Sequence, residues 1–218
     1  MKPVLVFGTG DFADIVSFVL EKKMGRSIAA YAVHARFKRE DFWRERPLVS
    51  LEESALLYPP GEYDAALAVI GKKMFRQREA LFVEIRGMGY RLINVIHPRA
   101  CVDTGEIGSG NVILANVSIE AHCSIGDGNI IWQNTVLPHH NKIGSFCNLA
   151  PSVSLSGYSS VGNHCFVGNN VCVKNRIHIP DDCFIGAGAY VSGPLREGTV
   201  LVPERSIVLA GKTGFDFL

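Results

Sequence analysis

Residues 107–191 decide the fold, and they read IGSGNVILANVSIEAHCSIGDGNIIWQNTVLPHHNKIGSFCNLAPSVSLSGYSSVGNHCFVGNNVCVKNRIHIPDDCFIGAGAYV. Every sixth residue is isoleucine, leucine or valine, without exception at fifteen positions: Ile107, Ile113, Ile119, Ile125, Ile131, Leu137, Ile143, Leu149, Leu155, Val161, Val167, Val173, Ile179, Ile185 and Val191. A period of six fits neither a 3.6-residue helix nor a strand that alternates every two residues. It is typical of a prism of short parallel strands with one hexapeptide per wall. Fifteen hexapeptides, three to a coil, predict a β-helix of five coils.

A second periodicity supports the first. The residue four places after each aliphatic is mostly small, and four cysteines occupy this site: Cys123, Cys147, Cys165 and Cys183. We expect these four, and Cys101 one step upstream of the aliphatic register, to be reduced core residues, and Cys172 to be exposed. Glycines recur 18 residues apart at Gly108, Gly126, Gly144 and Gly162, and again at Gly168 and Gly186. We expect them to supply the backbone angles of the turns.

The composition excludes several classes of protein. The chain has 218 residues, 47% hydrophobic and 20% charged, with a net charge of +1. That charge gives no electrostatic case for a nucleic-acid partner or an anionic membrane. The apolar stretches are too short for membrane insertion, and the start MKPVLVFGTGD lacks the features of a signal peptide. We therefore expect a cytoplasmic protein.

Residues 1–97 predict an α/β N-terminal domain with a small parallel sheet. The expected strands are Pro3–Phe7, Ser27–Val33, Ala65–Ile70 and Arg91–Ile96, and the expected helices are Asp11–Met24 and Met74–Met88. The charged segment Phe37–Arg46 predicts a surface loop. His97-Pro98 then forms a linker, because proline disfavours helix for the residue before it. We expect a β-helix domain at 98–203 and a C-terminal tail at 204–218.

Two features of this first part could bind phosphate. The stretch Gly8-Thr9-Gly10-Asp11-Phe12-Ala13 matches G-x-G-x-x-A between a strand and a helix, where backbone N–H groups can hold an anion. A tight turn in any α/β domain would look the same. No acidic residue follows the second strand at Ala32–Arg36, which argues against NAD. Lys72, Lys73 and Arg76 suit a diphosphate at the carboxyl edge of the sheet, or equally a solvated basic turn.

The histidines of the coils are the candidates for catalysis. On the 18-residue grid His139 shares a column with Gly157, and His140 shares one with His122 and Tyr158. An imidazole beside small residues is suited to remove a proton near neutral pH. Surface histidines of a solenoid are the plain alternative. His122 and His140 could also bind zinc, but the pattern favours a site without metal.

The whole chain resembles bacterial nucleotide-sugar and sialic-acid acyltransferases of the left-handed β-helix class. In arrangement it is most similar to the N-acetyltransferases that act on UDP-linked 4-amino-sugars. The segments that carry this resemblance are Val4–Gly10, Val69–Arg76, Ile93–Ala100 (INVIHPRA), Asn134–Gly144 (NTVLPHHNKIG) and Ile177–Val191. The resemblance implies a Rossmann-like nucleotide-sugar-binding domain, a left-handed parallel β-helix, acetyl-CoA or another acyl-CoA as co-substrate, and a homotrimer.

The resemblance also implies roles for individual residues. His139 aligns with the base that deprotonates the acceptor, and Gly157 with the glycine whose N–H faces the acyl carbonyl oxygen. Asn169 and Ala187 align with residues along the coenzyme A groove between subunits. The family usually has an acidic residue where this chain has His140, so His139 and His140 could exchange roles. Residues 201–205, LVPER, replace the usual ending over the coenzyme.

The sequence thus predicts an acyl-CoA-dependent transferase that acylates the amino group of a nucleotide-activated amino-sugar. Two alternatives stay open at this point. The acceptor could be a hydroxyl group of a sugar or a sialic acid. The chain could also be a non-catalytic scaffold that senses a nucleotide.

Overall fold

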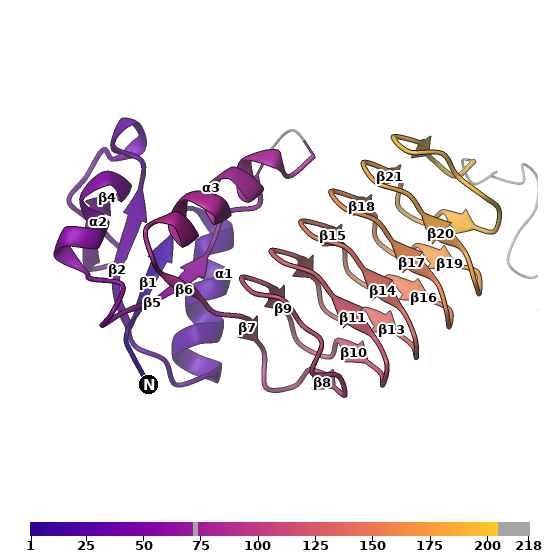
Figure 1. Ribbon diagram of the computed structural model, residues 1–218, viewed down its shortest axis with the longest axis horizontal. Helices are drawn as coiled ribbons and strands as arrows, with labels where there is room; N and C mark the ends of the chain where they lie inside the picture. The colour runs from indigo at the N-terminus through magenta and orange to yellow at the C-terminus, as the bar shows by residue number, and fades with distance from the viewer. Residues whose placement is uncertain (72–73, 205–218) are drawn as a thin grey trace, which may run out of the picture.

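The protein consists of an α/β sheet followed by a three-walled β-helix, as the computed structural model describes it for residues 1–71 and 74–204 (Figure 1). The first sheet has six strands in the order β3-β4-β2-β1-β5-β6, parallel throughout except for the antiparallel pair β3–β4. Its strands are β1 (Val4–Phe7), β2 (Ile28–Val33), β3 (Phe42–Trp43), β4 (Arg46–Ser50), β5 (Asp64–Leu67) and β6 (Arg91–Leu92).

Helices cover both faces of this sheet. They are α1 (Asp11–Phe18), which continues as the π-helix η1 (Val19–Lys23), the short 3-10 helix η2 (Ala35–Phe37), α2 (Leu51–Leu57) and α3 (Arg76–Gly87). Phe12, Val16 and Leu20 pack on one face, and residues of α2 and α3 such as Leu51 and Ile85 pack on the other. The predicted helices are therefore present, as are the strands predicted at Pro3–Phe7, Ser27–Val33 and Ala65–Ile70, with bounds shifted by a few residues.

Two expectations for this part were wrong. The segment Phe37–Arg46 is not simply a loop, because it contains β3 and turns back into β4. The stretch Arg91–Ile96 is not one strand but two. Between them Asn94 accepts a hydrogen bond from the Asn111 N–H and donates one to the Gly108 carbonyl. Because of this turn, β6 pairs with the first sheet and β7 pairs with the β-helix.

Helix α2 was not among the predicted helices, although its start has a clear signal in the sequence. The Ser50 side chain accepts a hydrogen bond from the Glu53 N–H at 3.3 Å and lies 2.5 Å from the Glu53 carboxylate. A serine followed three residues later by glutamate is the sequence pattern of a capping box, which marks the start of a helix. Here the serine caps the helix and its hydroxyl donates to the glutamate.

The three walls of the β-helix consist of two-residue strands stacked in parallel. The first wall has β8 (Cys101–Val102), β10 (Ser118–Ile119), β13 (Val136–Leu137), β16 (Ser154–Leu155), β19 (Cys172–Val173) and β22 (Tyr190–Val191). The second has β11 (Ser124–Ile125), β14 (Lys142–Ile143), β17 (Ser160–Val161) and β20 (His178–Ile179). The third has β7 (Val95–Ile96), β9 (Val112–Ile113), β12 (Ile130–Ile131), β15 (Asn148–Leu149), β18 (Phe166–Val167), β21 (Phe184–Ile185) and β23 (Val200–Leu201).

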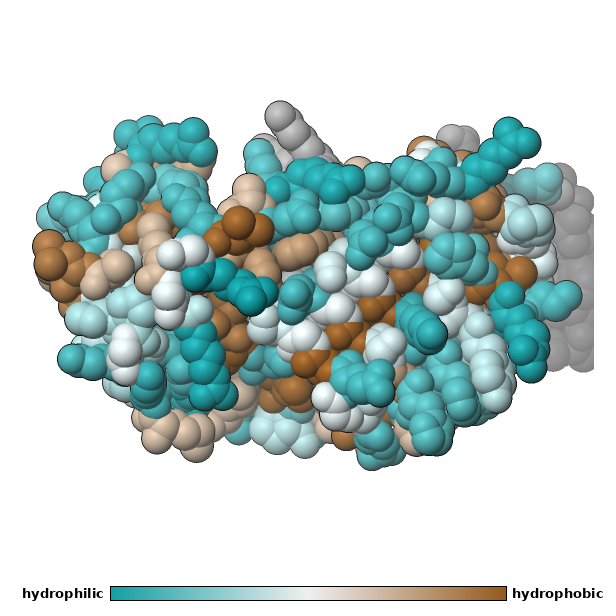
Figure 2. Space-filling view, in the orientation of Figure 1, coloured by the Kyte–Doolittle hydropathy of each residue, from teal (hydrophilic) through white to brown (hydrophobic). Residues whose placement is uncertain are grey.

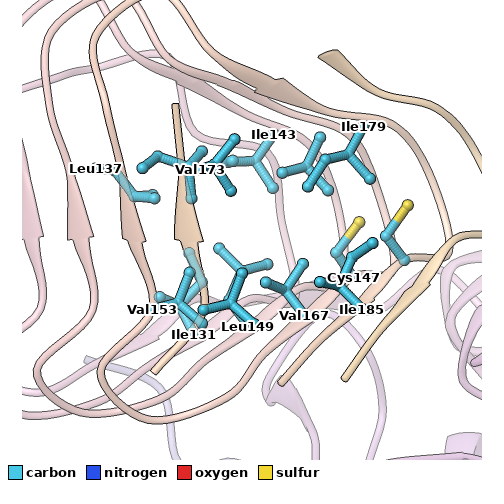
Figure 3. Close-up of a cluster of buried hydrophobic side chains, with 14 of the residues drawn as sticks. Ile131, Leu137, Ile143, Cys147, Leu149, Val153, Val167, Val173, Ile179 and Ile185 are labelled. Atoms are coloured by element: carbon cyan, nitrogen blue, oxygen red, sulfur yellow. The ribbon is translucent and has the colours of Figure 1, made fainter. Parts of the chain in front are cut away.

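The sixth-residue aliphatics fill the interior, as predicted. Figure 3 shows Leu137, Ile143, Leu149 and Val167 pointing into the space between the walls. Paired strands of successive coils are 18 residues apart, as in Ile125 with Ile143. The buried cysteines Cys123, Cys147, Cys165 and Cys183 join this core.

Cys101 was expected in the core and is exposed instead. The first coil explains the error, because Cys101 pairs with Ser118 and Val102 with Ile119, whereas Ile107 pairs with Ile125. The chain is thus one residue shorter between Val102 and Ile107 than in the coil above. That deletion turns Val102 inward in place of Cys101. Cys172 is exposed, as predicted.

The glycines act differently from our expectation. The left-handed backbone angles occur one after another at every sixth residue, mostly at non-glycines: Gly110, Asn116, His122, Gly128, Asn134, His140, Phe146, Ser152, Tyr158, His164, Asn170, Arg176, Asp182 and Gly188. The Gly108–Gly162 column is needed for a close approach between coils instead. A Cβ on Gly126 would lie 2.7 Å from the Gly144 carbonyl oxygen.

The β-helix and the α/β part share a buried interface. Val112 and Ile130 of the third wall join the core that contains Phe12 and Leu20, so α1 and η1 lie between the first sheet and the coils (Figure 1). Arg78 of α3 is 1% exposed and connects the two parts. Its guanidinium donates to the carbonyls of Leu67 and Val69 at the end of β5, and to those of Gly110 and Gly128 at one corner of the coils. Burial lowers the pKa of Arg78 to about 9, so the group remains charged at neutral pH while the four carbonyls stabilise it.

Candidate active site

His139 and His140 lie side by side at the corner between β13 and β14, and both are exposed. The His139 N–H donates to the Glu120 carboxylate at 2.9 Å, which fixes the backbone against the preceding coil. The two Nδ1 atoms are 3.1 Å apart. The predicted pair of imidazoles is therefore in direct contact.

A column of rings holds His140 in place. Its ring lies between that of His122 at 4.8 Å and that of Tyr158 at 4.6 Å, and the Arg176 guanidinium lies 4.5 Å over Tyr158. All four residues have left-handed backbone angles, which point successive side chains in the same direction. Partial desolvation first, and then the charges of His122 and His139, lower the pKa of His140, so it is neutral at physiological pH.

Gly157 lies directly beneath His139. A Cβ on Gly157 would be 2.6 Å from Cε1 and 2.9 Å from Nε2 of His139, so any side chain there would displace the imidazole. The Gly157 carbonyl accepts hydrogen bonds from the Asn175 side chain and the Arg176 N–H. Its own N–H donates to no other group among residues 1–71 and 74–204. The corner thus combines a proton acceptor with an unused backbone donor.

Asn169 and Ala187, the predicted coenzyme A residues, lie at a different corner of the coils. Both are exposed, and the Asn169 carbonyl accepts from the Gly188 N–H. That corner lies between the third and first walls, whereas His139 lies between the first and second. One chain therefore does not bring these residues to His139.

A pocket of about 490 Å³ opens at the carboxyl ends of β1, β2 and β5. Its walls are mostly apolar, with Gly8, Val33, Leu51, Val69, Ala80 and Leu81 among the lining residues. His34 and Glu84 supply polar groups, with His34 Nε2 3.5 Å from the Glu84 carboxylate. Neither residue was predicted to belong to a site, although His34 directly follows a predicted strand. Gly8 is required here, because a Cβ would meet the Ala68 carbonyl oxygen at 2.6 Å and its φ is +128°.

The other predicted phosphate-binding residues are spread out. Gly10 precedes α1 and Asp11 is exposed, but Phe12 is buried, against Trp132 and the Arg78 guanidinium. Arg76 donates to Asp182 at 2.9 Å and lies 3.0 Å from His164 Nε2, so it faces the coils. Its contact with a diphosphate stays a prediction, as do those of Lys72 and Lys73, which lie outside the described residues.

The remaining predictions concern metal, membrane and His97. No group of three potential metal ligands occurs in the described part of the chain. The described helices also include none with the length and hydropathy of a membrane span. His97 is buried and its Nδ1 accepts from the Arg99 N–H at 3.0 Å, which fits the structural role we expected.

Comparison with known proteins gives this geometry a context. A family profile, the bacterial transferase hexapeptide (six repeats), matches residues 105–139. Perosamine N-acetyltransferase from Caulobacter crescentus, solved with CoA and GDP-perosamine, is 28% identical, with 93% of this chain and 94% of that chain covered and a TM-score of 0.82. This chain is an acyltransferase, and its coils contain a hexapeptide repeat.

A second solved structure shares the architecture of this acyltransferase. The acetyltransferase domain of PglB from Neisseria gonorrhoeae, in complex with acetyl coenzyme A, is 21% identical, with 93% of this chain and 96% of that chain covered and a TM-score of 0.81. At that identity the match supports the left-handed β-helix fold. A search of curated proteins finds no match.

Proposed function

We propose that the protein transfers an acyl group, acetyl in the first instance, from coenzyme A to the amino group of a nucleotide-activated amino-sugar. The observation that carries this proposal is the 28% identity, across 93% of the chain, to an N-acetyltransferase solved with CoA and GDP-perosamine. The exposed imidazole above Gly157 supports it, since an acyl transfer needs a base beside an oxyanion donor.

The reaction is a direct attack on the thioester. The acceptor nitrogen forms a bond to the thioester carbonyl carbon while His139 removes a proton from that nitrogen. The carbonyl oxygen becomes negatively charged, and the Gly157 N–H is available to donate to it. The C–S bond then breaks, and His139 gives its proton to the leaving thiolate. In other enzymes one such donor lowers the activation free energy by about 3 kcal/mol.

The pocket at the sheet edge is the proposed nucleotide site. Its volume of about 490 Å³ and its apolar walls suit a flat base, and it lies at the carboxyl ends of parallel strands, where α/β sheets bind ligands. We therefore assign the Rossmann-like, nucleotide-sugar-binding role to residues 1–97. The acyltransferase role falls to 98–203 and the tail to 204–218.

We propose a homotrimer as the active form. Asn169 and Ala187 lie at a different corner from His139, and in a trimer a coenzyme A between two chains would contact His139 of one chain and the other corner of its neighbour. The described coils also expose apolar side chains, which include Val136, Phe184 and Tyr190. Figure 2 shows a diagonal band of apolar residues across one face of the coils, bordered by hydrophilic ones. Association would bury part of that area.

The test combines binding and turnover. Thermal shift with acetyl-CoA and with GDP-, UDP- and dTDP-linked sugars measures binding, and the release of free thiol from acetyl-CoA with GDP-perosamine or UDP-linked 4-amino-sugars measures transfer. We expect stabilisation by both classes and product acylated on nitrogen. Acylation on oxygen would favour the O-acyltransferase, and a response to nucleotides alone would favour a sensor. Sedimentation should give three times the 23.8 kDa chain mass.

A further inference from the structure

The contact between His139 and His140 constrains where protons can be. Their Nδ1 atoms are 3.1 Å apart, within hydrogen-bond distance. Between two ring nitrogens such a bond requires that one carries the hydrogen and the other a lone pair. The tautomers of the two residues are therefore coupled. If His139 donates from Nδ1, its Nε2 has the free lone pair and His140 carries its own hydrogen on Nε2.

The surroundings decide between the two arrangements. Both faces of His140 are covered, by His122 and by Tyr158, and the cation of Arg176 lies on the same column. A positive charge on His140 would thus lie in contact with a second histidine ring, that of His122. His139 instead meets Tyr158 edge to face at 79° and has only the Gly157 backbone beneath it. The stacked ring of His122 therefore disfavours a positive charge on His140.

The nearby acidic group does not neutralise either ring. Glu120, in the preceding coil, accepts from the His139 backbone N–H. In the described part of the chain, no carboxylate is hydrogen-bonded to the ring of His139 or His140. The titratable and charged groups around the pair are thus Glu120 and His122 on one side, and Tyr158 and Arg176 on the other.

We propose that His140 is a positioning residue that acts as a neutral imidazole. It accepts the Nδ1–H of His139, fixes the tautomer, and leaves Nε2 of His139 free to take the proton of the acceptor. This inference rests on the proposed function and extends it, because it assigns the base within the pair. An uncharged acceptor stabilises the imidazolium of His139 less than a carboxylate would. The enzyme should therefore stay active to lower pH than a histidine–carboxylate pair would allow.

Three substitutions at one position test this assignment. Asparagine and aspartate have the same shape and both tolerate the left-handed angle of His140, φ 62°. His140→Asn offers an uncharged oxygen to His139, His140→Asp offers a charged one, and His140→Ala offers none. The measurement is kcat/KM against pH, with acetyl-CoA and the acceptor that the transfer assay identifies. His178→Ala, which removes an exposed histidine hydrogen-bonded to Ser160 on the second wall, is the control for loss of a surface histidine.

We expect His140→Ala to lower kcat by about 10- to 100-fold, as for other residues that orient a reacting group, with the KM for acetyl-CoA unchanged. His140→Asn should recover part of that loss and keep the wild-type pH profile. His140→Asp should move the acidic limb of the profile upward by about one pH unit. The proposal is overturned if the Asn and Asp profiles coincide, if His140→Ala is as active as the His178→Ala control, or if His140→Ala is inactive while His139→Ala retains activity.

A readout that needs no turnover separates this proposal from the proposed function. Nitrogen-15 NMR of the imidazoles at about pH 8, with His139→Ala and His140→Ala for assignment, reports which nitrogen carries hydrogen. We expect hydrogen on Nδ1 of His139 and on Nε2 of His140. If these tautomers are observed but the protein transfers no acyl group, the proposed reaction is contradicted while the hydrogen-bonded pair of histidines is supported. The reverse tautomers in an active enzyme would overturn the pair alone.

Discussion

Two corners of the same coils have nearly the same backbone conformation, but one is exposed and the other is covered by α3. At one, His122, His140, Tyr158 and Arg176 stack with left-handed angles and remain exposed. At the other, Phe146, His164 and Asp182 have the same angles but lie under α3. There His164 stacks on Phe146 and lies 3.0 Å from both Glu79 and Arg76.

The difference shows what makes a histidine available for chemistry. His164 is 8% exposed at its side chain and its Nε2 is occupied by neighbours from α3. His139 has its Nδ1 held by His140 while its Nε2 is not in any hydrogen bond with a described residue. The repeat provides many equivalent corners, and the covering elements decide which of them holds a structure together and which can meet a substrate.

The strongest way to test this contrast is to remove one histidine from each corner. His139→Ala should lower kcat by about 10²- to 10⁴-fold, because a base contributes that much, and should shift the melting temperature little. His164→Ala should keep kcat and lower the free energy of unfolding by about 1–3 kcal/mol, because it removes a buried ring that stacks on Phe146. Steady-state kinetics and chemical denaturation measure both. Equal activities of the two variants would contradict the assigned base.

Arg78 tests how firmly the covered corner is attached. Arg78→Met leaves the carbonyls of Gly110 and Gly128 without their buried donor, so the free energy of unfolding should fall by about 1–3 kcal/mol for each carbonyl left unpaired. Arg86→Met is the matched control, since Arg86 is exposed and lies 4.0 Å from Asp127. It should cost less than about 0.5 kcal/mol. Denaturant titration decides, and equal losses would refute the connecting role of Arg78.

Two glycine substitutions distinguish a glycine that the packing of the coils requires from one that the position of His139 requires. In Gly144→Ala the Cβ would lie 2.7 Å from the Gly162 backbone. Because that backbone cannot move aside, the free energy of unfolding should fall by about 1–3 kcal/mol. In Gly157→Ala the Cβ would meet the exposed His139 ring, which can rotate away, so stability should hold while kcat falls about 10- to 100-fold. Unchanged kcat in Gly157→Ala would argue against His139 in its observed position.

The smallest expected effect concerns pH. Burial, followed by the charges of Lys23 and Arg99, lowers the pKa of His97 below its ordinary value near 6.5. The unfolded chain therefore binds this proton more readily, and the stability that neutral His97 contributes is present above about pH 6.5 and is lost as the pH falls through its lower folded pKa. Melting temperature should thus drop less steeply between pH 7 and pH 5 in His97→Gln than in the wild type. Parallel curves would exclude His97 as the source.

The repeat was predictable because one side chain in six must point inward, so its period is visible in the sequence. The shift of Cys101 to the surface was not, because a one-residue deletion between Val102 and Ile107 leaves no mark in the spacing of the later aliphatics. The closeness of His139, His140 and Gly157 was also predictable, because it follows from the 18-residue coil. The contact of Arg76 with His164 and Asp182 was not predictable, because it depends on how α3 docks on the coils.

The left-handed corner residues have a consequence for how such proteins can change. The corners already accept asparagine, histidine, phenylalanine, serine, tyrosine, arginine and aspartate. For a non-glycine residue this backbone conformation costs roughly 1–2 kcal/mol, less for asparagine and aspartate and more for β-branched residues. Replacement among the residue types already found at these corners therefore changes the stability of the coil little. A new reactive side chain can therefore be introduced at a corner while the aliphatic core and the stacked strands of the β-helix stay the same.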